Sequence, residues 1–185
     1  MILCVDASVR NDSRTKRLAD AVLSKLNGPV EYVKLKDIAF PVSDESFLKK
    51  RDELIASGAF DDDSFILARQ FADADTIVIV APYWDLSFPA SLKQYIETIN
   101  VLGITFEYTA DGYPRGLCKA DRLYYVMTAG GNYVPEEYGY GYIRDLAQSF
   151  YGIKDVELIK AVGLDIFGAD PEKIIEDCIL GMKQF

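Results

Sequence analysis

The stretch that decides the fold is Thr76-Ile-Val-Ile-Val-Ala-Pro-Tyr-Trp-Asp-Leu-Ser-Phe-Pro-Ala-Ser-Leu-Lys-Gln-Tyr95. Its apolar run from Ile77 to Ala81 predicts a strand that is buried on both faces of a parallel sheet. Pro82 ends the run, and Pro89 opens a helix whose apolar residues recur at helical spacing. Residues 83–88 are therefore predicted to form a loop at the carboxyl end of a strand, where open α/β sheets bind their ligands. Taken alone, this aromatic loop is equally consistent with a hydrophobic turn that only caps the core.

Further apolar runs predict a sheet built around this strand. The other predicted strands are residues 2–5, 30–35, 123–127 and 156–162. Helices are predicted from Leu18 to Leu26, over 64–74, from Pro89, from about Ile143 and over 171–182. Such alternation indicates an α/β fold with a parallel sheet and right-handed crossovers. The second and fifth predicted strands carry charged residues and the other three do not, so we expect those two at the sheet edges, in the order 2-1-3-4-5.

Two segments depart from the alternation of strands and helices. Residues 104–114 contain Asp111-Gly112, a strong turn signal that predicts a hairpin excursion from the sheet. Residues 36–63 include a stretch of helical propensity over 45–57, and we interpret this segment as a mobile or lid-like insertion. The chain, residues 1–185, is long enough for one domain with a substantial core.

Composition excludes several classes of function. The net charge of −9 disfavours nucleic acid and anionic membranes as partners, because both require surfaces rich in Lys and Arg. The chain has no histidine, which removes Ser-His-Asp triads, histidine general bases and most zinc sites. Cys4, Cys118 and Cys178 are widely spaced and odd in number, which indicates a reduced, cytoplasmic protein. Neither a secretion signal nor a membrane span is indicated. Another group must therefore supply the chemistry.

The first of three loops at the predicted switch point suits a phosphate. Residues 1–25 hold five basic residues against three acids, in a chain that is otherwise acidic. Within them, residues 8–15 offer the amides of a helix start, which attract anions. The side chains suited to a phosphate are Ser8, Arg10, Ser13, Arg14 and Thr15. The alternative is that the polar residues of this loop only cap the helix.

The other two loops add different chemistry at the same edge of the sheet. The loop after residues 77–81 offers ring and apolar surface for a planar ligand, from Tyr83, Trp84, Leu86 and Phe88. The loop over residues 128–132 contains Gly130-Gly131, where the backbone can approach a ligand closely, although an ordinary turn explains the pair equally well.

Three motifs now carry a resemblance to a known family. They are Ser8-x-Arg10-x-x-Ser13-Arg-Thr15, Ala81-Pro-Tyr-Trp-Asp-Leu-Ser-Phe-Pro-Ala-Ser-Leu-Lys-Gln-Tyr-Ile-Glu97 and Thr128-Ala-Gly-Gly131. Together they resemble the FMN-dependent NAD(P)H azoreductase and quinone reductase family, and the second motif is the specific one. The likeness extends over most of the chain, including Gly112 and Gly116 of the predicted hairpin and Gly163-Leu-Asp-Ile166.

The resemblance implies a flavodoxin-like three-layer sandwich that binds FMN, with NADH or NADPH as co-substrate and a quinone or azo compound as small-molecule electron acceptor. Carried over residue by residue, it assigns the phosphate to Ser8, Ser13, Arg14 and Thr15. It assigns the isoalloxazine and ribityl groups to Pro82, Tyr83, Trp84, Asp85 and Leu86, and the other edge of the ring to Thr128, Ala129, Gly130 and Gly131. Asp85 stands where the family has asparagine, so an acceptor-only carboxylate either shifts the flavin potential or holds the loop.

The resemblance also implies a homodimer with the flavin at its interface. Four tyrosines would fit such a surface or would pack near one helix start, namely Tyr133, Tyr138, Tyr140 and Tyr142. The expected mechanism is two-step hydride transfer, in which NAD(P)H reduces the flavin and leaves before the acceptor binds. No residue is assigned a proton-transfer role.

Two other classes of protein share this topology. A flavodoxin would carry single electrons without substrate turnover, but its phosphate loop is short and rich in Thr and Gly, unlike residues 8–15. A receiver-type signalling domain needs an acceptor aspartate where Ala81-Pro82 stands, which makes it the weakest of the three alternatives.

Overall fold

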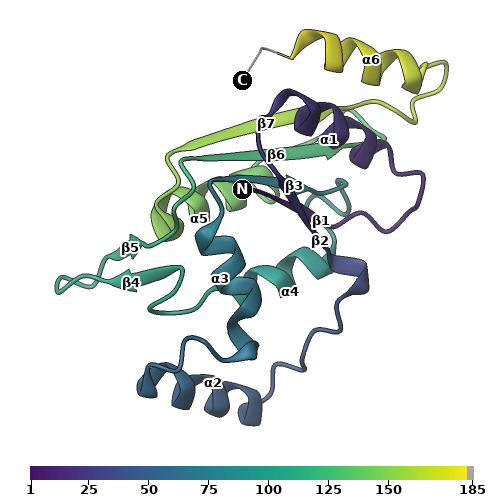
Figure 1. The fold of residues 1–185 in the computed structure, drawn as a ribbon. Coiled ribbons are helices and arrows are strands. Elements are labelled where there is room, and N and C mark those ends of the chain that lie inside the picture. The colour runs from purple at the N-terminus through teal and green to yellow at the C-terminus, as the bar shows by residue number, and fades with distance from the viewer. Residues whose placement is uncertain (183–185) are drawn as a thin grey trace.

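The central sheet has the strand order expected from the charge pattern. The computed structural model describes residues 1–182, and its five-stranded parallel sheet runs in the order β2-β1-β3-β6-β7 (Figure 1). These strands are β1 (Ile2–Asp6), β2 (Val30–Lys34), β3 (Thr76–Val80), β6 (Arg122–Thr128) and β7 (Asp155–Ala161). Counted among sheet strands alone, this order is the predicted 2-1-3-4-5, so the prediction is confirmed.

Burial explains why the charged strands lie outside. Every residue of β1 is buried, whereas three of the five residues of β2 are exposed. In the register of the sheet, Asp6 pairs with Val80 and Val80 with Val126, so β1 and β3 end at the same level and β6 continues for two more residues. The loops that follow these three strands therefore start side by side at one edge of the sheet.

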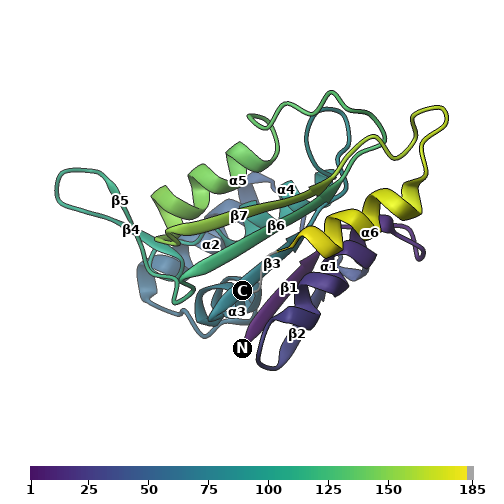
Figure 2. The same cartoon turned by 90° about the horizontal axis from the view of Figure 1, so that it is seen from above.

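Helices cover both faces of the sheet (Figure 2). One face carries α1 (Arg14–Lys25) and α6 (Pro171–Gly181), whose apolar residues share a core with Val78 and Tyr124. The other face carries α3 (Ile66–Asp73), α4 (Ala90–Ile99) and α5 (Tyr140–Leu146). Its core includes the fully buried rings of Phe71 and Tyr95. The result is the three-layer sandwich that the sequence predicted.

Three helix boundaries differ from the predictions. The first helix, predicted from Leu18, begins four residues earlier, at Arg14. The helix predicted over residues 64–74 begins as a short 3-10 turn, Asp63–Phe65, before α3. The helix expected from about Ile143 starts three residues earlier, at Tyr140, and it continues beyond Leu146 as a wider π-type segment, Ala147–Tyr151. Gly152 follows with a φ of 80°, which is a common way to end a helix.

The predicted hairpin is confirmed. Strands β4 (Phe106–Tyr108) and β5 (Pro114–Gly116) pair antiparallel and extend away from the sheet (Figures 1 and 2). The turn contains Gly112, whose φ of 81° explains the glycine. At the base of the hairpin, a Cβ on Gly116 would overlap the backbone of Tyr151 and Gly152. The hairpin therefore depends on a glycine to lie against the end of the π-type segment.

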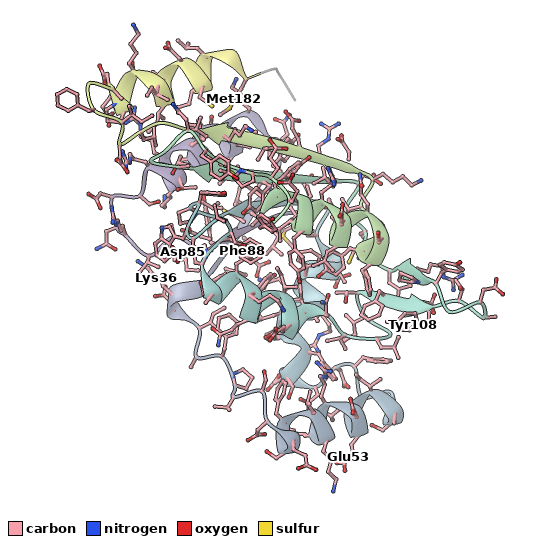
Figure 3. All side chains as sticks on the ribbon, turned by 180° about the vertical axis from the view of Figure 1, so that it is seen from behind. Lys36, Glu53, Asp85, Phe88, Tyr108 and Met182 are labelled. Carbon is pink, nitrogen blue, oxygen red and sulfur yellow. The ribbon has the colours of Figure 1, made fainter. Side chains whose placement is uncertain are left out.

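The segment over residues 36–63 does not form a lid. After a 3-10 turn, Leu35–Asp37, it contains α2 (Glu45–Ser57), which has no buried residue. Figure 3 shows Glu53 of α2 at the opposite end of the molecule from Met182, beyond the layer of α3 and α4. Side chains such as Phe40 and Leu54 pack against the core on that outer side. No helix within residues 1–182 combines the length and the apolar character that crossing a membrane requires.

Candidate functional site

The three predicted loops meet around one cavity of about 620 Å³. It lies where β1, β3 and β6 end, and its volume falls in the range of small-molecule sites, about 300–1,000 Å³. The predicted site residues that line it are Ser8, Arg10, Ser13, Arg14, Thr15, Pro82, Tyr83, Trp84, Thr128, Ala129 and Gly130. No residue of 36–63 lines it, so the interpretation of that segment as a lid is wrong.

The first loop presents unused hydrogen-bond donors to this cavity. Asp6 is buried and accepts the amide of Ser8 at 2.8 Å, which holds the loop at the end of β1. Ser13 caps α1, because its Oγ accepts the amide of Lys16 at 3.2 Å. The amides of Arg14 and Thr15, in the first turn of α1, donate to no acceptor within residues 1–182. Loop 8–15 therefore caps the helix, and it also offers free donors of the kind that attract an anion.

Thr15 and Thr128 connect the first loop to the third. Their Oγ1 atoms are 2.7 Å apart, and both residues are buried. Either hydroxyl can donate in this pair, so the other keeps its proton for a third group. The floor of the cavity is thus one hydrogen-bonded unit made from β6 and α1.

The second loop is a tight turn in a strained conformation. Trp84 and Ser87 exchange two backbone hydrogen bonds, of 3.1 and 2.7 Å, across Asp85 and Leu86. Both central residues have positive φ, 50° for Asp85 and 67° for Leu86, as the tightest hairpin turns require. Leucine is rare in this region, and such strain is typical of functional loops. The turn leaves the ring of Trp84, which is 43% exposed, on the cavity wall.

Asp85 and Leu86 are not among the residues that line the cavity, although they directly follow Trp84, which does. Positive φ at both positions forms the turn that presents Trp84, so their visible role is conformational. In Figure 3 Asp85 lies near Phe88, which belongs to the same loop. The ring of Phe88 packs against Tyr142, with centroids 5.9 Å apart, and is part of the core instead of the cavity.

The third loop pairs with a segment that the sequence prediction missed. The amides of Leu164 and Asp165 donate to the carbonyls of Ala129 and Gly130, and both Leu164 and Asp165 line the cavity. A Cβ on Gly130 would overlap the Asp165 carboxylate, so this glycine makes room for a side chain. A Cβ on Gly131 would face open space, and Gly131 is not among the residues that line the cavity.

The sequence contains a signal that the loop after β7 belongs to the cavity. Gly163 follows the last strand of the sheet, as Gly130 follows β6, and loops at carboxyl ends of strands converge. The charge pattern predicts only a sheet edge for this strand, and Gly163-Leu-Asp-Ile166 belongs to the resemblance without an assigned role. The cavity residues missed for this and similar reasons are Val9, Asp12, Leu164, Asp165 and Glu172.

Charges of both signs line the cavity. Arg14 donates from one terminal nitrogen to Asp165 Oδ1 at 2.8 Å and from the other to the carbonyl of Leu164 at 3.3 Å. Glu172, at the start of α6, forms an ion pair with Arg17. Asp12 adds a third carboxylate to the lining. Within residues 1–182, no group of three or more His, Cys, Asp or Glu residues is placed to hold a metal ion.

Flavin mononucleotide fits this set of donors. The hydroxyls of Ser8 and Ser13 and the free amides of Arg14 and Thr15 can all donate to phosphate oxygens at a helix N-terminus. Pro82, Tyr83 and Trp84 give the apolar wall that a planar ring system needs. Burial of the Tyr83 hydroxyl raises its pKa, and the nearby Tyr133 and Glu137 add to the shift. Tyr83 therefore stays neutral at physiological pH.

The four tyrosines of the third loop and α5 divide into two pairs. Tyr140 donates to the carbonyl of Val156 at 2.9 Å, and Tyr142 packs on Phe88, so these two belong to the interior of the chain. Tyr133 and Tyr138 are exposed, at 80% and 60%. Ser87 Oγ donates to the carbonyl of Tyr138 at 2.6 Å, which connects the strained turn to the segment that carries the exposed pair.

Comparison with known proteins identifies the family of this chain. A family model described as "Flavodoxin-like fold" matches residues 1–185. An FMN-dependent NADH:quinone oxidoreductase from Clostridium perfringens is 38% identical over 96% of this chain and 93% of its own length. Another protein of that name, from Clostridium beijerinckii, is 36% identical over 97% and 93%.

Solved structures show the same fold. An azoreductase from Bacillus anthracis superposes with a TM-score of 0.82, at 24% identity over 97% of this chain and 94% of its own. An FMN-dependent NADH-azoreductase from Bacillus anthracis in complex with FMN gives a TM-score of 0.79, at 24% identity, with coverage of 97% and 94%. The family model matches the whole chain, and both relatives are more than one third identical to it in sequence. This chain therefore belongs to the flavodoxin-like family that includes the FMN-dependent NADH:quinone oxidoreductases.

Proposed function

We propose that this chain is an FMN-dependent oxidoreductase that passes electrons from NADH to quinones, with azo compounds as a second class of acceptor. The observation that carries this proposal is the cavity in which free donors of a helix N-terminus and an apolar ring wall stand side by side. The names of its relatives support the same activity, FMN-dependent NADH:quinone oxidoreductase. They do not favour the alternative of an electron carrier without turnover.

FMN, when bound, supplies the redox chemistry, since it can accept a hydride from NADH and deliver electrons to a quinone. The chain supplies binding and orientation. Ser8, Ser13, Thr15 and the first amides of α1 are proposed to hold the phosphate, because their donors point to a common volume at the start of the helix. Arg10 and Arg14 are the cations that line this part of the cavity.

The wall of Pro82, Tyr83 and Trp84 is proposed to lie along the flavin ring, with Thr128, Ala129 and Gly130 at its other edge. The strained turn at Asp85 and Leu86 holds Trp84 in its exposed position. Exposed aromatic surface beside a cofactor suits a planar acceptor such as a quinone. Asp85 and Leu86 would then affect the flavin through the turn that they form.

A homodimer is part of the proposal. Exposed apolar side chains gather on the segments next to the cavity, at Trp84, Leu86, Tyr133 and Tyr138. Aromatic residues in this arrangement are typical of interface cores. We also propose a cytoplasmic location, supported by three cysteines that all remain free thiols.

The chain contains its own reporter for the main test. Trp84 is its only tryptophan, and it lines the cavity. Titration of the flavin-free protein with FMN should quench tryptophan fluorescence to a saturable limit, and the bound protein should be yellow. Steady-state oxidation of NADH with menadione then separates an enzyme from an electron carrier. A protein that binds no FMN, or that binds it without turnover, would contradict the proposal.

Ser13→Ala and Ser91→Ala make a matched pair for the site. Ser13 caps α1 at the cavity, whereas Ser91 lies in the first turn of α4 and does not line the cavity. Ser13→Ala should weaken FMN binding about tenfold or more, since it removes a donor to the phosphate and a helix cap. Ser91→Ala should leave the affinity unchanged.

A further inference from the structure

The cavity contains more negative than positive charge, which is unexpected for a phosphate site. Its lining includes two cations, Arg10 and Arg14, and three carboxylates, Asp12, Asp165 and Glu172. Glu172 is neutralised by Arg17, which stands behind the lining. Asp165 is different, because its partner is Arg14, one of the two cations that face the cavity.

Asp165 is held in place by the backbone. Its amide donates to the carbonyl of Gly130 at 3.0 Å, and the absence of a Cβ at Gly130 leaves the space that its carboxylate fills. The carboxylate accepts from Arg14 at 2.8 Å. Arg14 also donates to the carbonyl of Leu164 at 3.3 Å, so both of its terminal nitrogens already have partners. The guanidinium is thus engaged before any anion reaches the cavity.

We propose that Asp165 competes with the phosphate of FMN for Arg14 and so lowers the preference of this chain for FMN over the unphosphorylated flavin. This inference rests on the proposed function. A phosphate that approaches Arg14 must share this cation with a carboxylate, and the two negative groups repel each other. The isoalloxazine and ribityl parts carry no such charge, so their binding is independent of Asp165.

The ion pair of Arg14 and Asp165 is partly exposed to solvent, so a change of charge at residue 165 can be tested by flavin binding. The side chain of Arg14 is 32% exposed and that of Asp165 64%, so water screens the ion pair only in part. Asp165→Asn removes the charge and keeps an oxygen that can still accept from Arg14. The fold should tolerate this change, because asparagine has nearly the same shape as aspartate and the hydrogen bond of residue 165 to Gly130 is made by its backbone amide.

The experiment titrates flavin-free protein with FMN and with riboflavin and follows the fluorescence of Trp84. Asp165→Asn should tighten FMN binding about three- to tenfold and leave riboflavin binding within about twofold of the wild type. In an Arg14→Gln background, Asp165→Asn should no longer change the ratio of the two affinities, because the shared cation is gone. Glu172→Gln is the matched control, since it removes a carboxylate of the same lining whose partner is Arg17.

The outcomes of this experiment distinguish failure of the proposed function from failure of the inference about Asp165. If the wild type binds neither flavin, the proposed function and this inference both fail. If the wild type binds FMN but Asp165→Asn binds it equally or more weakly, only the inference fails. If Glu172→Gln tightened FMN binding as much as Asp165→Asn does, the general charge of the cavity would be responsible and the inference would be overturned. If Asp165→Asn tightened riboflavin binding as much as FMN binding, a rearranged cavity would be responsible, and the inference would again be overturned.

Discussion

The side-chain oxygens of Thr15 and Thr128 lie 2.7 Å apart in the interior, although 113 positions separate the two residues in the chain. Thr15 stands in the first turn of α1, and Thr128 is the last residue of β6. The pair therefore joins the phosphate loop to the loop that carries Gly130. Stability and flavin affinity should both depend on it.

Replacement of either threonine by valine should destabilise the protein. The hydroxyl that remains would be buried without a partner, which costs about 1–3 kcal/mol in the free energy of unfolding. The double variant Thr15→Val/Thr128→Val should lose little more than one single variant, because it leaves no orphaned hydroxyl. Urea unfolding of the four proteins measures this cycle. Additive losses would show that the two hydroxyls are not coupled.

Leu86→Gly should stabilise the strained turn. A side chain at a φ of 67° costs about 1–2 kcal/mol, and glycine removes this cost while it adds about 0.5–1 kcal/mol of backbone entropy. A net gain of about 0.5–1 kcal/mol is expected. Leu86→Ala is the control, since it shortens the side chain and keeps the Cβ that causes the strain. Equal stability of the two variants in urea would contradict a strained Leu86.

Gly116→Ala should loosen the hairpin of β4 and β5. Its Cβ would overlap the backbone of Tyr151 and Gly152, and backbone atoms cannot rotate aside as a side chain can. We expect a loss of about 1–3 kcal/mol in the free energy of unfolding. Gly181→Ala, where a Cβ would meet nothing within 4 Å, should be neutral or slightly stabilising. Thermal unfolding followed by circular dichroism compares the two variants directly.

Stability should fall at alkaline pH because of buried thiols. Burial raises the pKa of Cys4 and of Cys118 to about 12, and a nearby carboxylate, Asp6, adds to the shift at Cys4. In the unfolded chain a thiol has a pKa of about 8.5, so the unfolded state loses protons first as pH rises. This contribution to stability is complete below about pH 8.5 and is lost progressively up to about pH 12.

The expected slope is about 1.4 kcal/mol per pH unit for each thiol within this window. Burial also raises the pKa of Tyr95 and Tyr125, and these phenols steepen the loss at the upper end. Urea midpoints measured between about pH 8 and pH 11 would show the decline. Cys118→Ala should reduce the slope by the share of one thiol. A profile that is flat over this range would contradict the burial of these groups.

Sequence patterns alone determined the sheet and its order. Uncharged runs such as residues 77–81 can be buried on both faces, whereas Glu31 and Lys34 require an edge, and this constraint is local enough to see in a single chain. The same logic located the cavity, since loops after neighbouring parallel strands must start at one edge. Most of the predicted residues in these loops line it.

Tertiary structure decided the roles that depend on partners distant in the sequence. Asp85 and Leu86 belong to the specific motif, and their positive φ makes them the centre of the turn that presents Trp84. Gly130 makes room for Asp165, and Asp165 holds Arg14, a relationship between three loops that no spacing within one of them encodes. Periodicity reports which face of an element is buried, but the partner of a charge or a hydroxyl depends on how loops from separate strands pack together.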